Sequence, residues 1–127
     1  MADNGVYEVS VQGHFAAAHH LAGYQGQCEA VHGHNWDIEV FVRGAELDAT
    51  GLLVDFRILK QALREALADL DHTDLNTHPV FQSVNPSSEH LARYLHGELS
   101  RRVNSPRCRV HRVAVNETRG ARASYTA

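Results

Sequence analysis

The chain has few residues that could brace a small fold covalently or interrupt it: two cysteines and three prolines among 127 residues. Cys28 and Cys108 alone exclude a disulfide framework, and they predict free thiols in a reducing cytoplasm. No stretch approaches the length of a membrane-spanning helix, and the N-terminus has no basic segment followed by an apolar run. We therefore expect a cytoplasmic protein with no membrane partner.

An excess of charge of one sign is also lacking. The 12 basic and 15 acidic residues give a net charge of -3, which provides no general attraction to nucleic acid. With 43% hydrophobic and 21% charged residues, the chain is expected to form a single domain over residues 1–127 that folds without disulfides. Histidine, by contrast, is abundant at 10 residues.

Apolar and polar side chains alternate in segments that we predict to be strands. Residues 6–12 and 34–43 show this pattern, which is typical of strands with one buried face. A third strand is predicted after Pro106 and a short one near residues 121–125. The order strand, strand, helix, helix, strand, strand predicts an α+β fold in which helices cover one face of an antiparallel sheet.

Two segments carry the signals of helices. Asp55 is a suitable N-cap, and apolar residues follow it at helical spacing. Residues 85–89 start a second helix, which ends near residues 104–106. The apolar stripes predicted to enter the core are Phe56, Leu59, Leu63, Leu67 and Leu70 in the first helix and Leu91, Tyr94, Leu95 and Leu99 in the second.

The segment CEAVHGH, residues 28–34, combines two histidines with a thiol. His32 and His34 would project from the same face of a strand, and they share parity with its apolar residues. Two such imidazoles predict part of a zinc site. The spacing leaves the third ligand open among His14, His19 and His20. Three imidazoles would leave a catalytic position open, whereas Cys28 as a fourth ligand would close a structural site.

Two further groups could take part in chemistry. Asp71 can orient His72 if the backbone turns both side chains the same way; otherwise the pair is a polar helix end. Together with Cys28, the pair forms a set that could activate a thiol. Glu117 shares the side of Val113 and Val115, so it either lies in water at an edge or binds paired donors of a ligand.

Six segments in order resemble the 6-pyruvoyl-tetrahydropterin synthase and 6-carboxytetrahydropterin synthase family. The resemblance implies a tunnelling fold, in which a four-stranded antiparallel sheet carries two helices between strands 2 and 3. It also implies a homo-oligomer, a trimer or hexamer, with active sites between subunits. The matching segments are FAAAH (15–19), Cys28 with HGH (32–34), VDF (54–56), LDHTDLN (70–76), NPSSE (85–89) and NET (116–118).

The resemblance also implies roles for individual residues. The zinc ligands would be His19, His32 and His34, with His14 and His20 left out. Zn2+ would act as a Lewis acid on the side chain of a small-molecule pterin substrate. The implied catalytic residues are Cys28 as the base and Asp71 with His72 as the proton-transfer pair, and Glu117 would anchor the pterin ring.

The spacing around Cys28 bears on the reaction. Its three-residue gap to His32 resembles bacterial 6-carboxytetrahydropterin synthases of the deazapurine (queuosine-type) pathway. These enzymes convert 7,8-dihydroneopterin triphosphate and release acetaldehyde and triphosphate. Glu29 resembles instead a folate-pathway branch that forms a 6-hydroxymethyl pterin, and the two together resemble dual-function members, unless Glu29 is an ordinary loop acid. Two further candidate functions are a 6-pyruvoyl-tetrahydropterin synthase and a non-catalytic metal- or pterin-binding module.

Overall fold

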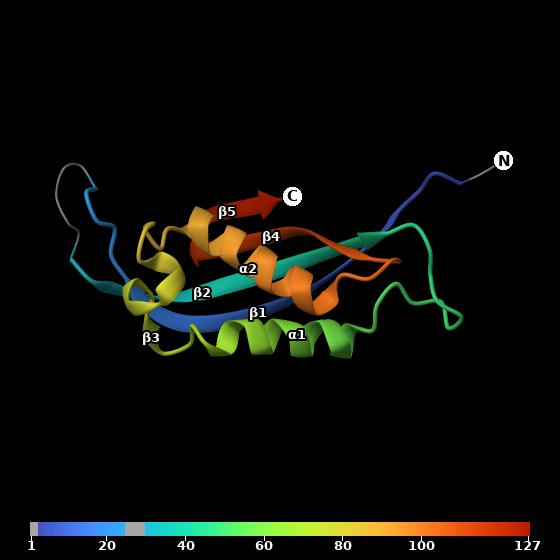
Figure 1. Ribbon diagram of the computed structural model, residues 1–127, viewed down its shortest axis with the longest axis horizontal. Coiled ribbons are helices and arrows are strands. Elements are labelled where there is room, and N and C mark those ends of the chain that lie inside the picture. The colour runs from blue at the N-terminus through green and yellow to red at the C-terminus, as the bar shows by residue number, and fades with distance from the viewer. Residues whose placement is uncertain (1–2, 25–29) are drawn as a thin grey trace.

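The computed structural model describes residues 3–24 and 30–127 (Figure 1). No helix in these ranges is long and apolar enough to cross a membrane. The elements are β1 (Tyr7–His19), β2 (His32–Gly44), α1 (Phe56–Ala68), β3 (Thr73–Asp74), two 3-10 turns (Leu75–Thr77 and Pro79–Phe81), α2 (Ser88–Val103), β4 (Arg109–Thr118) and β5 (Ala121–Thr126). The predicted order of the long elements is confirmed.

The sheet has five strands in the order β3-β1-β2-β4-β5. The strands β1, β2, β4 and β5 are antiparallel neighbours, but β3 runs parallel to β1. The prediction of a four-stranded, wholly antiparallel sheet is therefore wrong. The reason is local: β3 has two residues, too few for an alternation signal, and it pairs because the backbone N–H of His72 donates to the Ala16 carbonyl at 2.6 Å.

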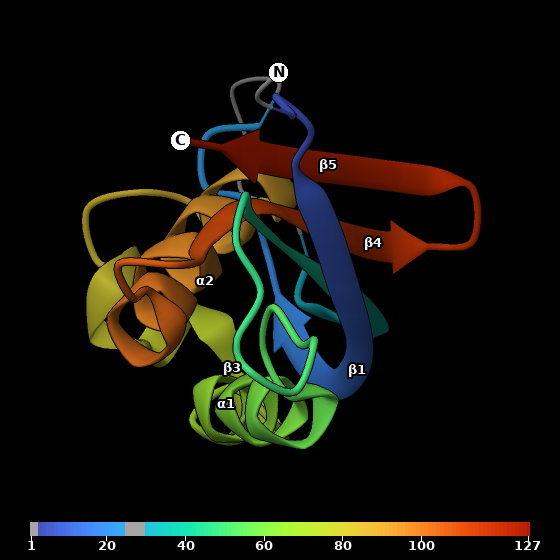
Figure 2. The same cartoon turned by 90° about the vertical axis from the view of Figure 1, so that its right-hand side faces the viewer.

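The first helix begins at the predicted cap, the second begins within the predicted start at residues 85–89, and both lie on the same side of the sheet (Figures 1 and 2). The Asp55 side chain accepts from the backbone N–H of Arg57, and that of Ser87 accepts from His90. Phe56 is 52% exposed, so its predicted place in the core is wrong. It is the first residue of α1, where the helix has not yet reached the sheet face that buries the later residues of the stripe.

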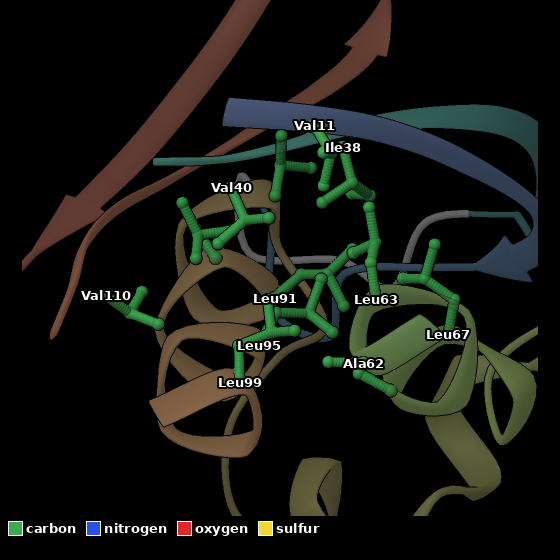
Figure 3. Packing of buried hydrophobic residues seen from close by; sticks show 14 of the residues in the cluster. Val11, Ile38, Val40, Ala62, Leu63, Leu67, Leu91, Leu95, Leu99 and Val110 are labelled. Carbon is green, nitrogen blue, oxygen red and sulfur yellow. The ribbon is translucent and has the colours of Figure 1, made fainter. Parts of the chain in front are cut away.

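The hydrophobic core lies between the helices and one face of the sheet (Figure 3). Val11 and Ile38 of the sheet pack over Leu63 of α1 and Leu95 of α2 in one cluster. Truncating a buried leucine of this kind to alanine costs roughly 2–5 kcal/mol. The core therefore holds β1 and β2 rigidly, and any side chain that continues their inward-facing row has a fixed position.

Candidate metal centre

Three histidines continue the inward-facing rows of β1 and β2 beyond the apolar core. His19 ends β1, and it pairs directly with His32 at the start of β2. His34 follows two residues later on the same face. Next in the row is Trp36, which is fully buried and holds the rings of His19 and His34 edge-on at centroid distances of 4.9 and 5.3 Å. The inward direction predicted for His32 and His34 agrees with their half-buried positions beside buried Trp36.

Glu117 of β4 joins these histidines. One ligand atom from each of the four residues lies within 4.8 Å of the others. The Glu117 Oε1 atom is 2.8 Å from Nε2 of His19 and 3.3 Å from Nε2 of His34. The sequence had assigned Glu117 to ligand recognition and not to this cluster. The structure thus brings four potential metal donors together: three imidazole nitrogens and one carboxylate oxygen.

Backbone carbonyls fix the tautomers of two of these rings. Nδ1 of His19 lies 2.8 Å from the carbonyl oxygen of Pro86, and Nδ1 of His32 lies 3.0 Å from that of Ala30. Because a carbonyl oxygen only accepts hydrogen bonds, each Nδ1 carries the proton. In the neutral rings, Nε2 then presents its lone pair to the cluster. This is the usual arrangement of a metal-ligating histidine.

The region around His19 Nε2 favours a cation. Within the part of the chain that the structure describes, this buried nitrogen makes no hydrogen bond, although Oε1 of Glu117 is 2.8 Å away. A nitrogen lone pair and a carboxylate oxygen repel at that distance unless positive charge lies between them. Three imidazoles and a carboxylate form a donor set that Zn2+ accepts in tetrahedral geometry. The residues therefore fit a zinc ion.

Two asparagines hold the chain segments that frame His19. The side chain of Asn76 accepts from the backbone N–H of His20 and donates to its carbonyl, at 2.9 and 3.0 Å. Asn85 binds Ala22 in the same two-way manner, at 2.9 and 3.0 Å. Asn85 directly precedes Pro86, so these bonds keep the Pro86 carbonyl beside the ring of His19. Sequence reasoning treated residues 85–89 only as a helix start and missed this support.

A bulge in β4 positions Glu117. The pairing of β4 with β5 shifts register between Asn116 and Thr118, so Glu117 is the extra residue. Asn116 is also the last residue of β4 that pairs with β2. A bulge re-aims a side chain and ends regular pairing. Glu117 points inward, as the alternation predicts, with 30% of its side chain exposed.

Asp71 and His72 form the predicted acid–histidine pair, but outside the four-residue cluster. Oδ1 of Asp71 accepts from the backbone N–H of Ala16 at 3.0 Å and lies 3.0 Å from Nδ1 of His72. The hydrogen bond from Ala16, followed by that from His72, lowers the pKa of the Asp71 carboxyl below its usual value. Asp71 is therefore an anion at neutral pH, able to orient the imidazole and to stabilise its protonated form.

The pair lies beside β1, at the end of the strand that carries His19. Asp71 and His72 both contact the backbone of Ala16. His72 is 81% exposed and lines a shallow hollow together with Ala16, Ala18, Gly33, Asn35 and the cluster residue His34. Within one chain, Asp71 and His72 are not among the four clustered donors.

His72 has a left-handed backbone conformation, with a φ of 59°. For a residue with a Cβ atom, this conformation costs about 1–2 kcal/mol. We expect His72→Val to lower the free energy of unfolding by a further ~1 kcal/mol because β-branched side chains tolerate this region worst, whereas His72→Gly should not be destabilised. Urea denaturation measures both. His14→Val is the control, since His14 is exposed on a regular strand. If the His72→Val protein were as stable as the wild type, the backbone at position 72 would not be strained.

Four candidate site residues remain to be accounted for. Cys28 and Glu29 fall outside the described residues. Of the histidines that spacing left open beside His19, His14 is exposed on the opposite face of β1. His20 follows the strand, and its ring lies beside Asn76 at 3.5 Å. Only His19 of these three joins His32 and His34 in the cluster.

Known proteins with similar sequences and folds identify the family. Residues 8–127 match the family described as 6-pyruvoyl tetrahydropterin synthase. A 6-carboxy-5,6,7,8-tetrahydropterin synthase of Bacillus subtilis is 32% identical over 121 residues, covering 88% of this chain and 80% of that protein. One of Synechocystis is 34% identical over 116 residues, covering 87% and 86%. The solved Caenorhabditis elegans 6-pyruvoyl tetrahydropterin synthase aligns with a TM-score of 0.86 and 26% identity, over 100% of this chain and 99% of that one.

The sequence matches and the fold together define a pterin-synthase type of protein. The chain belongs to the 6-pyruvoyl tetrahydropterin synthase family, a family of pterin enzymes. The resemblance noted from the six sequence segments is thereby confirmed.

Proposed function

We propose that this chain is a zinc-dependent 6-carboxytetrahydropterin synthase that converts 7,8-dihydroneopterin triphosphate and releases acetaldehyde and triphosphate. The observation that carries the proposal is the convergence of His19, His32 and His34 on one point, with two Nε2 lone pairs directed there by backbone carbonyls. The reaction is chosen because the Bacillus subtilis and Synechocystis relatives carry that enzyme's name. We place the product in a deazapurine (queuosine-type) pathway and the enzyme in the cytoplasm.

The chain's own residues would divide the chemistry among them. The three histidines would hold a zinc ion, which as a Lewis acid would lower the cost of removing a proton from the substrate's side chain. Cys28 would take that proton. His72, held by anionic Asp71, would move protons at the neighbouring carbon. Glu117 would accept the paired N–H donors of the pterin's amino-pyrimidine edge.

We further propose a homo-oligomer, a trimer or hexamer, with active sites between subunits. The position of Asp71 and His72 supports this arrangement. His72 is 81% exposed and is not among the four clustered donors. An imidazole exposed in this way can be reached by a substrate held between two copies of the chain. No nucleic acid or membrane partner is proposed.

The 6-pyruvoyl-tetrahydropterin synthase reaction is the second candidate, favoured by the matching Caenorhabditis elegans structure. Product identification separates the candidates. Purified protein with stoichiometric zinc is incubated with 7,8-dihydroneopterin triphosphate, and the pterins are identified by mass spectrometry. We expect 6-carboxytetrahydropterin and acetaldehyde. A 6-pyruvoyl product would favour the second candidate, and a 6-hydroxymethyl pterin would favour the folate branch. If the substrate stays unchanged, the result would favour a non-catalytic metal- or pterin-binding module.

A further inference from the structure

We propose that Glu117 is the fourth ligand of the metal in the substrate-free protein and that a bound pterin removes it from the metal. The inference rests on the proposed function, since it requires a metal held by the three histidines and a pterin ligand. It adds a metal-ligand role to a residue that the sequence assigned only to pterin binding. The centre would be closed at rest and would open on substrate binding.

The first observation is distance. Oε1 of Glu117 is 2.8 Å from Nε2 of His19 and 3.3 Å from Nε2 of His34, so one oxygen serves both rings. Ligand atoms in a tetrahedral zinc site lie about 3.3 Å apart, because each bond is ~2.0–2.1 Å long. The distances from this carboxylate oxygen to the nitrogens of two of the three imidazoles are thus close to those between two ligands of one zinc ion.

The second observation is that the contact between Glu117 and His19 has the geometry of two metal ligands and not that of a salt bridge. If Glu117 simply paired with a protonated His19, the ring N–H would point at the carboxylate. The structure has the short distance without the hydrogen bond, because Nε2 of His19 makes none in the described part of the chain. Donors arranged around a shared cation show this combination, since each directs its lone pair at the ion and not at its neighbour. The arrangement therefore fits ligation.

The third observation is that Glu117 is more exposed and less tightly held than His19. His19 is 2% exposed and its Nδ1 is held by Pro86, whereas the Glu117 side chain is 30% exposed at a strand bulge. Paired N–H donors that take both oxygens of the carboxylate compete with the metal for Oε1. When the donors bind, Glu117 would leave the metal, its carboxylate would keep its charge in the new hydrogen bonds, and one coordination position would open for a substrate oxygen.

Cobalt substitution tests the resting ligand set without relying on turnover. The wild type, Glu117→Gln and Glu39→Gln are each loaded with Co2+, and affinity is measured by competition with a chelator. Glu39 is the matched control because its carboxylate, bound to Ser10 and Arg122, lies on the other face of the sheet. We expect Glu117→Gln to bind Co2+ at least about tenfold more weakly and with an altered visible spectrum, as the loss of a ligand or its support requires. Glu39→Gln should match the wild type.

A ligand titration tests the exchange. Pterin without a side chain can donate its paired N–H groups to the Glu117 carboxylate, but it has no side-chain hydroxyl to offer the metal. Adding it to Co2+-loaded wild type should change the visible spectrum, because the carboxylate leaves the metal, whereas the spectrum of Glu117→Gln should not change. Cys28→Ala is included to exclude a thiolate ligand, and it should keep the wild-type spectrum.

The outcomes distinguish this inference from the proposed function. If the wild type binds one Co2+ per chain but Glu117→Gln has the same affinity and spectrum, the fourth-ligand role is wrong and the zinc enzyme stands. If pterin binds without a spectral change in the wild type, the exchange is wrong. If the wild type binds no metal, both the inference and the proposed function fail.

Discussion

Replacing His32 with alanine is expected to abolish both metal binding and turnover. His32 supplies one of the three imidazoles, and its Nδ1 bond to the Ala30 carbonyl leaves only Nε2 for a metal. Zinc content measured by mass spectrometry should fall from stoichiometric to near zero. The rate with 7,8-dihydroneopterin triphosphate should fall at least about 10³-fold, because a metal contributes several kcal/mol of transition-state stabilisation and each ~1.4 kcal/mol is tenfold.

His14→Ala is the matched control for this variant. His14 lies on the same strand as His19 but is exposed on the opposite face of the sheet. It should keep both zinc and activity. His32 is only half-buried, so the loss of its ring should leave the fold intact, which thermal unfolding of both variants checks. Stoichiometric zinc in a fully active His32→Ala protein would refute the metal centre.

Replacing Cys28 with alanine is expected to abolish formation of 6-carboxytetrahydropterin while zinc stays bound. A positioned acid or base typically contributes about 10²–10⁴-fold to a rate, and this is the loss we expect. The prediction rests on the sequence, since Cys28 lies outside the described residues. Rate and zinc content are measured on the same preparation.

Cys108→Ala controls for the loss of a thiol. Cys108 is a buried free cysteine whose sulfur donates to the Val103 carbonyl at the end of α2, in the core and not in the cluster. It should retain activity. Loss of zinc from Cys28→Ala would show instead that Cys28 is a metal ligand. In the same assay, Glu29→Ala tests the dual-function hypothesis: if every product is unchanged, Glu29 is an ordinary loop acid.

Local sequence patterns predicted most of the elements and the direction of the site residues. The caps at Asp55 and Ser87 depend on side chains that bind their own backbone two or three residues on, so they can be read from the chain. The direction of His32 and His34 depends only on the two-residue period of a strand. Neither needs knowledge of the rest of the fold.

Contacts between segments far apart in the chain could not be predicted from local sequence patterns. The strand β3 exists because residues 73–74 meet Ala17 and Ala18, which no pattern within two residues can reveal. The Pro86 carbonyl reaches His19 only because Asn85 ties two loops together. The contacts of Asp71 and His72 with the backbone of Ala16 depend on the turn at His72, and nothing in the neighbouring sequence predicts the positive φ of that histidine.

The sequence by itself determined the family, the strands and helices, and a pair of inward-facing histidines, because each depends on residues close together in the chain or on motifs in a fixed order. Only the tertiary structure decided that His19 faces His32, that backbone carbonyls fix the tautomers, and that Glu117 completes the cluster. The physical reason is that a donor set for a metal is defined by distances of a few ångströms, and strand pairing, register and a bulge set those distances among residues up to about 100 positions apart.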